Sequence, residues 1–155
     1  MSAVGILGML LAISGITLVV TFFALGGLYL LFSYGLYKLA QRANVENSWL
    51  AFIPIVQYYI LGKVVKEVKI GSWVVPHLEW VLLLAPVIYG ILTGIPFLTT
   101  IAGVLYLLFY IIVTYTLFKK YTPHAVVMTI VAFLLPFMYA IFVFAIRNNK
   151  AVIQL

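Results

Sequence analysis

Glu79 is the one carboxylate inside a long apolar run of this sequence, and it is the first candidate for chemistry. An ionisable group at membrane depth is by default a functional candidate, for example as a proton or cation site. Pro76 suits the first position of a helix, which would instead put His77 and Glu79 in an opening turn, where the helix dipole favours acidic groups. His77 and Glu79 also spell H-x-E, but no second pair of ligands stands nearby, so we expect no metal site.

A second polar group surrounds a proline in the middle of a short apolar segment. Glu46, Asn47, Gln57 and Tyr58 flank Pro54 there. The functional interpretation is a small pocket for a headgroup, an ion or a partner's helix. The structural interpretation is that Asn47 or the serine after it caps a helix, while Gln57 bonds a carbonyl freed by Pro54. Both interpretations stay open at the level of sequence.

The usual catalytic constellations are missing from the sequence. It has no nucleophile-base pair, no intramembrane carboxylate pair, no glycine-rich phosphate loop and no metal-ligand cluster. The absence of cysteine excludes disulfides, thiol catalysis and thiolate metal sites. We therefore expect a noncatalytic protein without a cofactor.

Composition indicates that lipid is the solvent for most of the chain. Of 155 residues, 66% are hydrophobic and 8% are charged, and the mean hydropathy is +1.25, far outside the usage of soluble domains. The apolar runs are continuous, without the alternation of barrel strands, so they predict helices. The net charge of +6 is carried by residues between apolar runs, which indicates attraction to anionic lipid at the inner leaflet and no nucleic acid.

The apolar runs predict an all-α, polytopic membrane protein with a single domain over residues 1–155. Residues 1–37 carry no charge and no polar turn, which favours one long helix with its membrane part near residues 16–37. Further transmembrane helices are expected over 73–93 and 98–118. The run 125–146 has Pro136 at its centre, and it either spans as a kinked helix or dips in and returns.

Basic residues predict the orientation. They lie between the first and second runs and between the third and fourth runs, whereas the turn between the second and third has none. The positive-inside rule then places the amino terminus outside and both basic loops in the cytoplasm. Arg147 and Lys150 stay inside only if the fourth run returns to the side from which it starts.

An internal repeat relates residues 28–63 to residues 105–147, with 73–93 as a linker helix. LYLLF occurs in both halves. Each half then has a basic residue, a proline and a tyrosine at nearly matching spacing, namely Lys38, Pro54 and Tyr58 in the first and Lys119, Pro136 and Tyr139 in the second. Each half thus predicts a span followed by a proline-centred apolar segment.

The segment 48–69 is expected to be an interfacial or re-entrant elbow on the cytoplasmic side. Its 14 residues from Trp49 to Gly62 would reach about 21 Å as a helix, which is too short to cross a hydrocarbon core of about 30 Å. Beyond it, apolar residues at 61, 64, 65 and 68 fall on one helical face. Lys63 and Glu67 have the i,i+4 spacing of an ion pair.

The stretch YGLYKLAQRANVENSWLAFIPIVQYYILGKV, residues 34–64, resembles small multi-pass membrane proteins of bacteria. The resemblance implies the bacterial cytoplasmic membrane and no particular activity.

Taken together, the sequence predicts a self-associating or accessory subunit of a bacterial membrane complex. Glycines along the first helix, among them Gly15, Gly26 and Gly27, would permit close helix contact. The alternative is a small transporter or channel built from two parallel repeats around the proline-broken segments.

Overall fold

The computed structural model describes residues 3–152, with the side chains of residues 13–152 except residue 96. It is all-helical, with 77% of the residues in helices, so the predicted all-α class is confirmed. In chain order, the elements are α1 (Ala3–Arg42), η1 (Ser48–Phe52), α2 (Val56–Val65), β1 (Lys69–Ile70), β2 (Trp73–Val74), α3 (Leu78–Leu92), α4 (Pro96–Tyr121), α5 (Ala125–Leu134), α6 (Phe137–Ala145) and η2 (Ile146–Asn148).

Helix α1 is a single helix of 40 residues, about 60 Å long, so the prediction of one helix in place of two is confirmed. It ends where Asn44 adopts a left-handed conformation with φ 53°. The amide of Asn44 donates to the carbonyl of Gln41 at 3.2 Å, and the amide of Val45 donates to the carbonyl of Ala40 at 3.0 Å. This is the Schellman pattern, in which the residues after a helix satisfy its last carbonyls.

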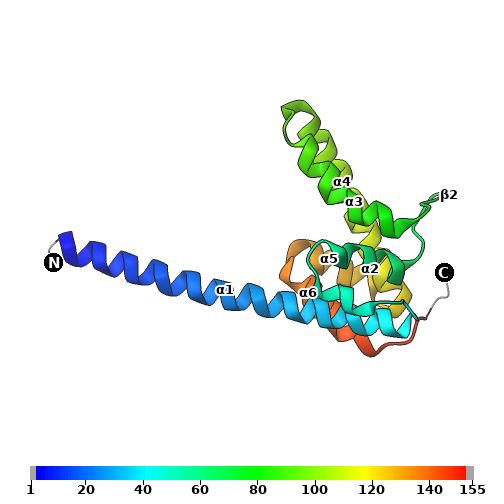
Figure 1. Ribbon diagram of the computed structural model, residues 1–155, viewed down its shortest axis with the longest axis horizontal. Helices are drawn as coiled ribbons and strands as arrows, with labels where there is room; N and C mark the ends of the chain where they lie inside the picture. The colour runs from blue at the N-terminus through cyan, green and yellow to red at the C-terminus, as the bar shows by residue number, and fades with distance from the viewer. Residues whose placement is uncertain (1–2, 153–155) are drawn as a thin grey trace.

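The hydrophobic core lies where the C-terminal part of α1 meets α2, the start of α3, the C-terminal half of α4 and α6. Each of these helices contributes fully buried side chains, among them Leu36, Leu39, Leu61, Val64, Leu78, Leu117, Phe118 and Val143. The head is the name used here for this core together with η1, α2, α5, α6 and η2, and with the parts of α1, α3 and α4 that pack on it. The first half of α1 and the far ends of α3 and α4 leave the head as two separate projections (Figure 1).

Two glycines let helices cross closely in the head. A Cβ on Gly62 of α2 would overlap the backbone of Glu79 in α3, whose nitrogen lies 2.6 Å from that position. A Cβ on Gly35 of α1 would lie 2.9 Å from the Cα of Phe144 in α6. Since contacts this short are not tolerated, only glycine permits both crossings at these distances.

Segment 48–65 forms a hairpin, here called the first hairpin. Its first part, η1, lies against α1, where the hydroxyl of Tyr29 donates to the carbonyl of Phe52 at 2.6 Å. The chain reverses at Pro54 and Ile55, where the amide of Val56 donates to the carbonyl of Pro54 at 2.9 Å. Ile55 has φ 72° and ψ −54°, a positive-φ γ-turn that is rare and strained, above all for a β-branched residue.

The helical part of the first hairpin ends at Val65, so the expectation of a continuous helical face over residues 61–68 is wrong. Lys66 adopts φ 72°, and residues 69 and 70 enter a strand. The four apolar residues at 61, 64, 65 and 68 are nevertheless all buried. Only their placement on one helical face was predicted, and their burial in the core is a finding of the structure.

Residues 125–146 form a second hairpin, made of α5 and α6 with a break at Leu135 and Pro136. Its two ends meet: the side-chain amide of Asn149 donates to the carbonyl of Tyr121 at 3.0 Å, and the amide of Val152 donates to the carbonyl of Lys120 at 2.7 Å. The segment therefore doubles back in space, and its path relative to a membrane stays a prediction. Pro136 contributes to the break because it has no amide proton to continue the ladder.

Between the hairpins, β1 and β2 pair in antiparallel register, with Gly71 at φ 63° in the two-residue turn. The helix expected over 73–93 therefore begins only at Leu78, and α3 has 15 residues, about 22 Å. Three transmembrane helices were expected. Within the described residues, two segments are long and apolar enough to cross a membrane, Ile13–Arg42 and Phe97–Tyr121.

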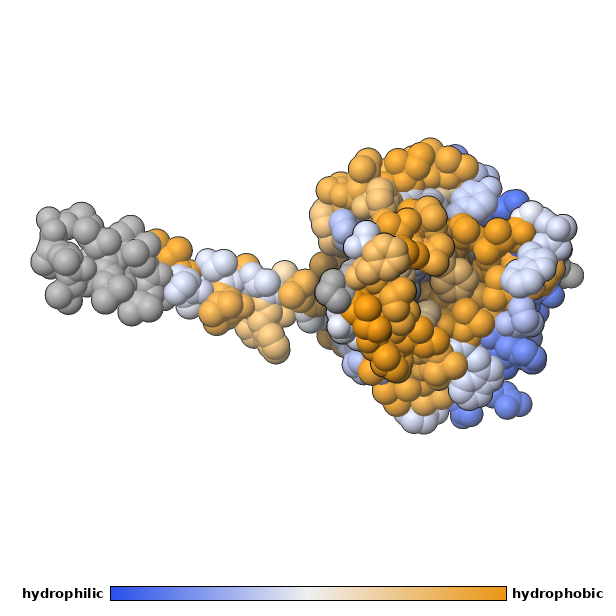
Figure 2. All heavy atoms as spheres, turned by 90° about the horizontal axis from the view of Figure 1, so that it is seen from above, coloured by the Kyte–Doolittle hydropathy of each residue, from blue (hydrophilic) through white to orange (hydrophobic). Residues whose placement is uncertain are grey.

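Hydrophobic and hydrophilic residues are separated along the molecule. Figure 2 shows apolar residues over most of the visible surface of the head, while the hydrophilic residues gather at the end away from the start of α1. The first half of α1 is exposed from residue 13 to residue 27. A soluble protein would not leave apolar surface of this extent uncovered.

Candidate functional site

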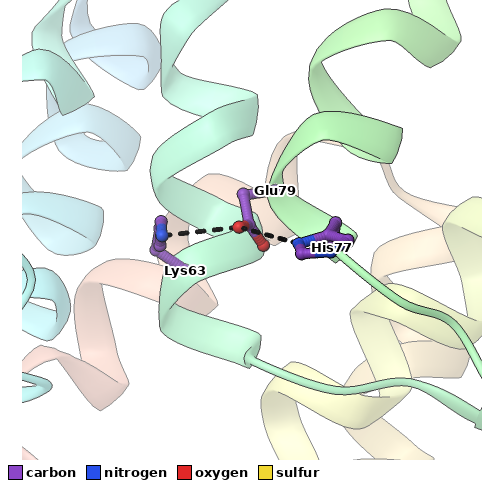
Figure 3. Close-up of polar contacts among 3 residues, drawn as sticks. All are labelled: Lys63, His77 and Glu79. Atoms are coloured by element: carbon purple, nitrogen blue, oxygen red, sulfur yellow. Dashed lines mark ion pairs between the residues drawn. The ribbon is translucent and has the colours of Figure 1, made fainter.

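Glu79 lies in the first turn of α3, where it pairs with a lysine of α2. Its Oε1 is 3.4 Å from Nζ of Lys63 and 4.0 Å from Nδ1 of His77 (Figure 3). The side chain of Glu79 is largely buried, whereas those of Lys63 and His77 are open to solvent. The expected position of Glu79 in an opening turn is thus observed, although the helix begins at Leu78 and His77 precedes it.

This ion pair replaces the one expected within the chain segment 63–67. Lys63 contacts Glu79 and not Glu67, because the close crossing at Gly62 brings α3 to the side of α2 on which Lys63 stands. A hydrogen bond from Lys63 to Glu79 and the charge of Glu79 raise the pKa of the lysine above its usual value. This ion pair joins α2 to α3, and it is not an arrangement of groups suited to acid-base catalysis.

Three of the predicted site residues lie just before the first hairpin or at its tip. Glu46 and Asn47 are exposed and line a surface cavity of about 420 Å³ between the end of α1 and α2. Asn47 precedes η1 in a left-handed conformation, but its side chain makes no capping hydrogen bond, so that part of the structural interpretation is wrong. The serine after it bonds the carbonyl of Val45 instead. Pro54 is exposed at the tip of the hairpin.

Gln57 and Tyr58 follow Pro54 and turn toward the protein interior. The Oε1 atom of Gln57 is buried and accepts no hydrogen bond from another described group. The expected bond, in which the side-chain amide of Gln57 would donate to a carbonyl near Pro54, stays a prediction. The carbonyl of Pro54 is bonded by the amide of Val56. Tyr58 packs against the hydrophobic core, as does Tyr139, the tyrosine that follows the proline of the second hairpin.

The second proline borders an apolar cavity. Pro136 and Tyr139 line a space of about 250 Å³ between α4, α5 and α6, together with Tyr110 and Thr114. The hydroxyls of Thr114 and Tyr139 are buried there. The segments after the two prolines therefore bring polar side chains into the same interior, although their sequence positions are far apart.

A polar cavity involves basic residues for which the sequence predicted only control of topology and attraction to anionic lipid. It has a volume of about 590 Å³ and opens among the ends of α1, α2 and α4 and the segment after α6. Four cations line it, and two asparagines join them: Arg42, Lys66, Lys120 and Lys150, with Asn44 and Asn149. We call this site the basic cavity. It lies at the hydrophilic end of the head.

Two of its cations are fixed by backbone carbonyls. Nζ of Lys120, a residue only 4% exposed, donates to the carbonyls of Val64 at 2.7 Å and Val65 at 3.4 Å. A guanidinium nitrogen of Arg42 donates to the carbonyl of Asn148 at 2.6 Å. The two halves of the chain thus hold each other together at this cavity. One feature of the sequence could have indicated the basic cavity: three of its cations stand at or just after the end of an apolar segment.

The described residues contain no group of three or more side chains that could hold a metal ion. The chain matches no family of known proteins, no curated protein sequence and no solved structure. Its function therefore has to be argued from its own geometry.

Proposed function

We propose that the protein is a noncatalytic integral protein of the bacterial cytoplasmic membrane that associates with itself through α1. One observation carries the proposal: the first half of α1 projects from the head, and no other described element runs beside it (Figure 1). At Gly15, Gly26 and Gly27, a Cβ would meet nothing within 4 Å. The same projecting helix is one of the two segments apolar enough to cross a membrane.

The dimensions of the projecting part support a partner inside the bilayer. Residues 13–30 extend about 27 Å as a helix, close to a hydrocarbon thickness of about 30 Å. Gly15 and Gly26 are eleven residues apart, so they share one face of α1 at about 100° per residue. A glycine on a helix face lets a second helix approach closely at that point. A second copy of the chain supplies an identical helix of matching length.

Association is tested by counting subunits of the purified protein in liposomes, at a protein-to-lipid ratio low enough to exclude chance neighbours. The variant with Gly15→Ile and Gly26→Ile should shift the protein toward the monomer, because added bulk separates the two helices. Ala24→Ile is the matched control, since it adds bulk on the face opposite Gly26 and should leave the stoichiometry unchanged. A wild-type protein that is monomeric at every dilution would refute the proposal.

The proposed topology places the amino terminus outside, with both hairpins entering from the cytoplasmic side and returning. The return of the second hairpin to Tyr121 and the gathering of hydrophilic residues at one end support it. Single cysteines at Thr93 and Asn149 test it in intact cells with a membrane-impermeant thiol reagent. We expect labelling at Thr93 and none at Asn149. Labelling at Asn149 from outside would contradict the re-entrant path.

A small transporter is the second candidate, and the buried polar interior favours it. Two buried side-chain oxygens without a partner among the described protein groups lie there, on Ser33 of α1 and Gln57 of α2. Partnerless polar atoms of this kind fit a path for a polar solute better than a packed core. If this is the function, the protein alone should give flux in liposomes, and Gln57→Leu should reduce it. Tyr34→Phe, at an exposed tyrosine, is the control.

A further inference from the structure

The basic cavity collects positive charge that the described protein does not neutralise. The whole chain has three acidic side chains, at positions 46, 67 and 79, and none of them lines the cavity. Glu79 is engaged with Lys63. The four cations therefore face one another across a space of about 590 Å³ without a carboxylate between them.

Helix dipoles offset only part of this charge. The cavity lies at the C-terminal ends of α1, α2, α4 and the α6–η2 segment. Each helix C-terminus is equivalent to roughly −0.5 of an elementary charge, so four ends contribute about −2 against four full positive charges. Roughly two positive charges remain. Interaction with the helix C-termini thus accounts for part of the positive charge in the cavity. The positive charge that remains favours the binding of an anion.

The donors of the cavity suit oxygen-rich anions. Arg42 has five N–H groups, of which one nitrogen is used on Asn148, and Lys120 has three donors, of which two are directed at α2. Lys66 and Lys150 are exposed and free to turn toward a ligand. A planar guanidinium beside lysine ammonium groups is the combination that proteins use for phosphate.

We propose that the basic cavity binds a phosphate group, carried either by an anionic lipid headgroup or by a soluble phosphate compound. The lipid source fits the position of the cavity, at the end of the two segments that are apolar enough to span a bilayer. The site differs from general attraction to an anionic surface because it is hollow, contains the buried Lys120, and is built by both halves of the chain. It does not depend on self-association, since one chain supplies every residue.

Native mass spectrometry of the purified full chain in neutral detergent tests the site. The probes are phosphatidylglycerol, phosphatidylcholine as the lipid without net charge, and inorganic phosphate. The test variant combines Lys66→Gln with Lys150→Gln, two exposed positions whose replacement leaves the anchored Arg42 and Lys120 in place. The control variant combines Lys69→Gln with Lys38→Gln, which removes the same net charge at positions outside the cavity.

We expect saturable binding of one phosphatidylglycerol, at least tenfold weaker in the cavity variant and within twofold of wild type in the control. If inorganic phosphate shows this pattern and phosphatidylglycerol does not, the site stands and its ligand is a soluble phosphate compound. Equal loss in both variants would mean diffuse surface attraction and overturn the proposal. So would saturable binding of neither probe, or a cavity variant that binds both as wild type does.

Discussion

The close crossing of α2 and α3 gives a stability prediction with a definite sign. Gly62→Ala places a methyl group against the backbone of α3, where the nitrogen of Glu79 would lie 2.6 Å and the carbonyl carbon of Leu78 2.9 Å away. Since ordinary contacts begin near 3.4 Å, one helix must move by more than half an ångström. Backbone atoms cannot turn aside as a side chain would, so the displacement involves the whole crossing.

The magnitude follows from a comparison with a glycine that has room. Gly90 lies in α3, and a Cβ there would meet nothing within 4 Å. Replacing a helical glycine by alanine favours the helix by about 0.5–1 kcal/mol, and both variants share this gain. Overpacking costs typically about 1–3 kcal/mol and acts only at Gly62. The two variants should therefore differ by about 1–3 kcal/mol, with Gly90→Ala the more stable.

The assay is reversible unfolding in mixed micelles, followed by circular dichroism, with the free energy of unfolding compared among wild type and the two alanine variants. Gly62→Ala should unfold at lower denaturant than wild type, and Gly90→Ala at equal or higher denaturant. A Gly62→Ala protein as stable as Gly90→Ala would show that α2 and α3 do not cross at this glycine. The same reasoning then fails for the Lys63–Glu79 pair that the crossing creates.

Two further predictions concern the tip of the first hairpin and the ion pair. Strain at the positive φ of Ile55 amounts to about 1–3 kcal/mol, and its side chain is 56% exposed, so Ile55→Gly should raise the free energy of unfolding. The neighbouring Val56→Gly, inside α2, should lower the free energy of unfolding by about 1 kcal/mol. Equal losses of this free energy in both glycine variants would refute the proposed strain at Ile55. Because Glu79 raises the pKa of Lys63 in the folded state, the pair stabilises fully below pH 10.5 as long as Glu79 is ionised, and its contribution is lost as the pH rises through the raised pKa of the lysine. Unfolding followed against pH should show a small alkaline loss that is missing in Glu79→Gln, and an identical loss in that variant would contradict the pairing.

The sequence alone determined features that depend on neighbouring residues. A run of 37 residues without charge or proline can only continue as a helix, and α1 does so. Pro54 and Pro136 interrupt the two hairpin segments at the expected places, because the effect of a missing amide proton is local.

Features that depend on distant residues were not predictable in the same way. The start of α3 was misplaced because residues 69–74 satisfy their backbone by pairing as strands, and composition does not distinguish that from a helical start. The return of residues 125–146 toward the end of α4 depends on the bonds of Asn149 and Val152 with Tyr121 and Lys120. The relation between the two proposed repeat halves remains a prediction.

The candidate sites divide along the same line. Glu79 could be placed in a first turn from the local pattern, but its partner could not, because the sequence offers Glu67 at ideal helical spacing and only the crossing at Gly62 brings Glu79 closer to Lys63. The basic cavity joins residues more than one hundred positions apart, as the bond from Arg42 to Asn148 shows. Local physics decided which segments are helices and where they break, whereas the meeting of four helix ends, and with it the charge they enclose, was decided by packing between segments that the sequence does not place side by side.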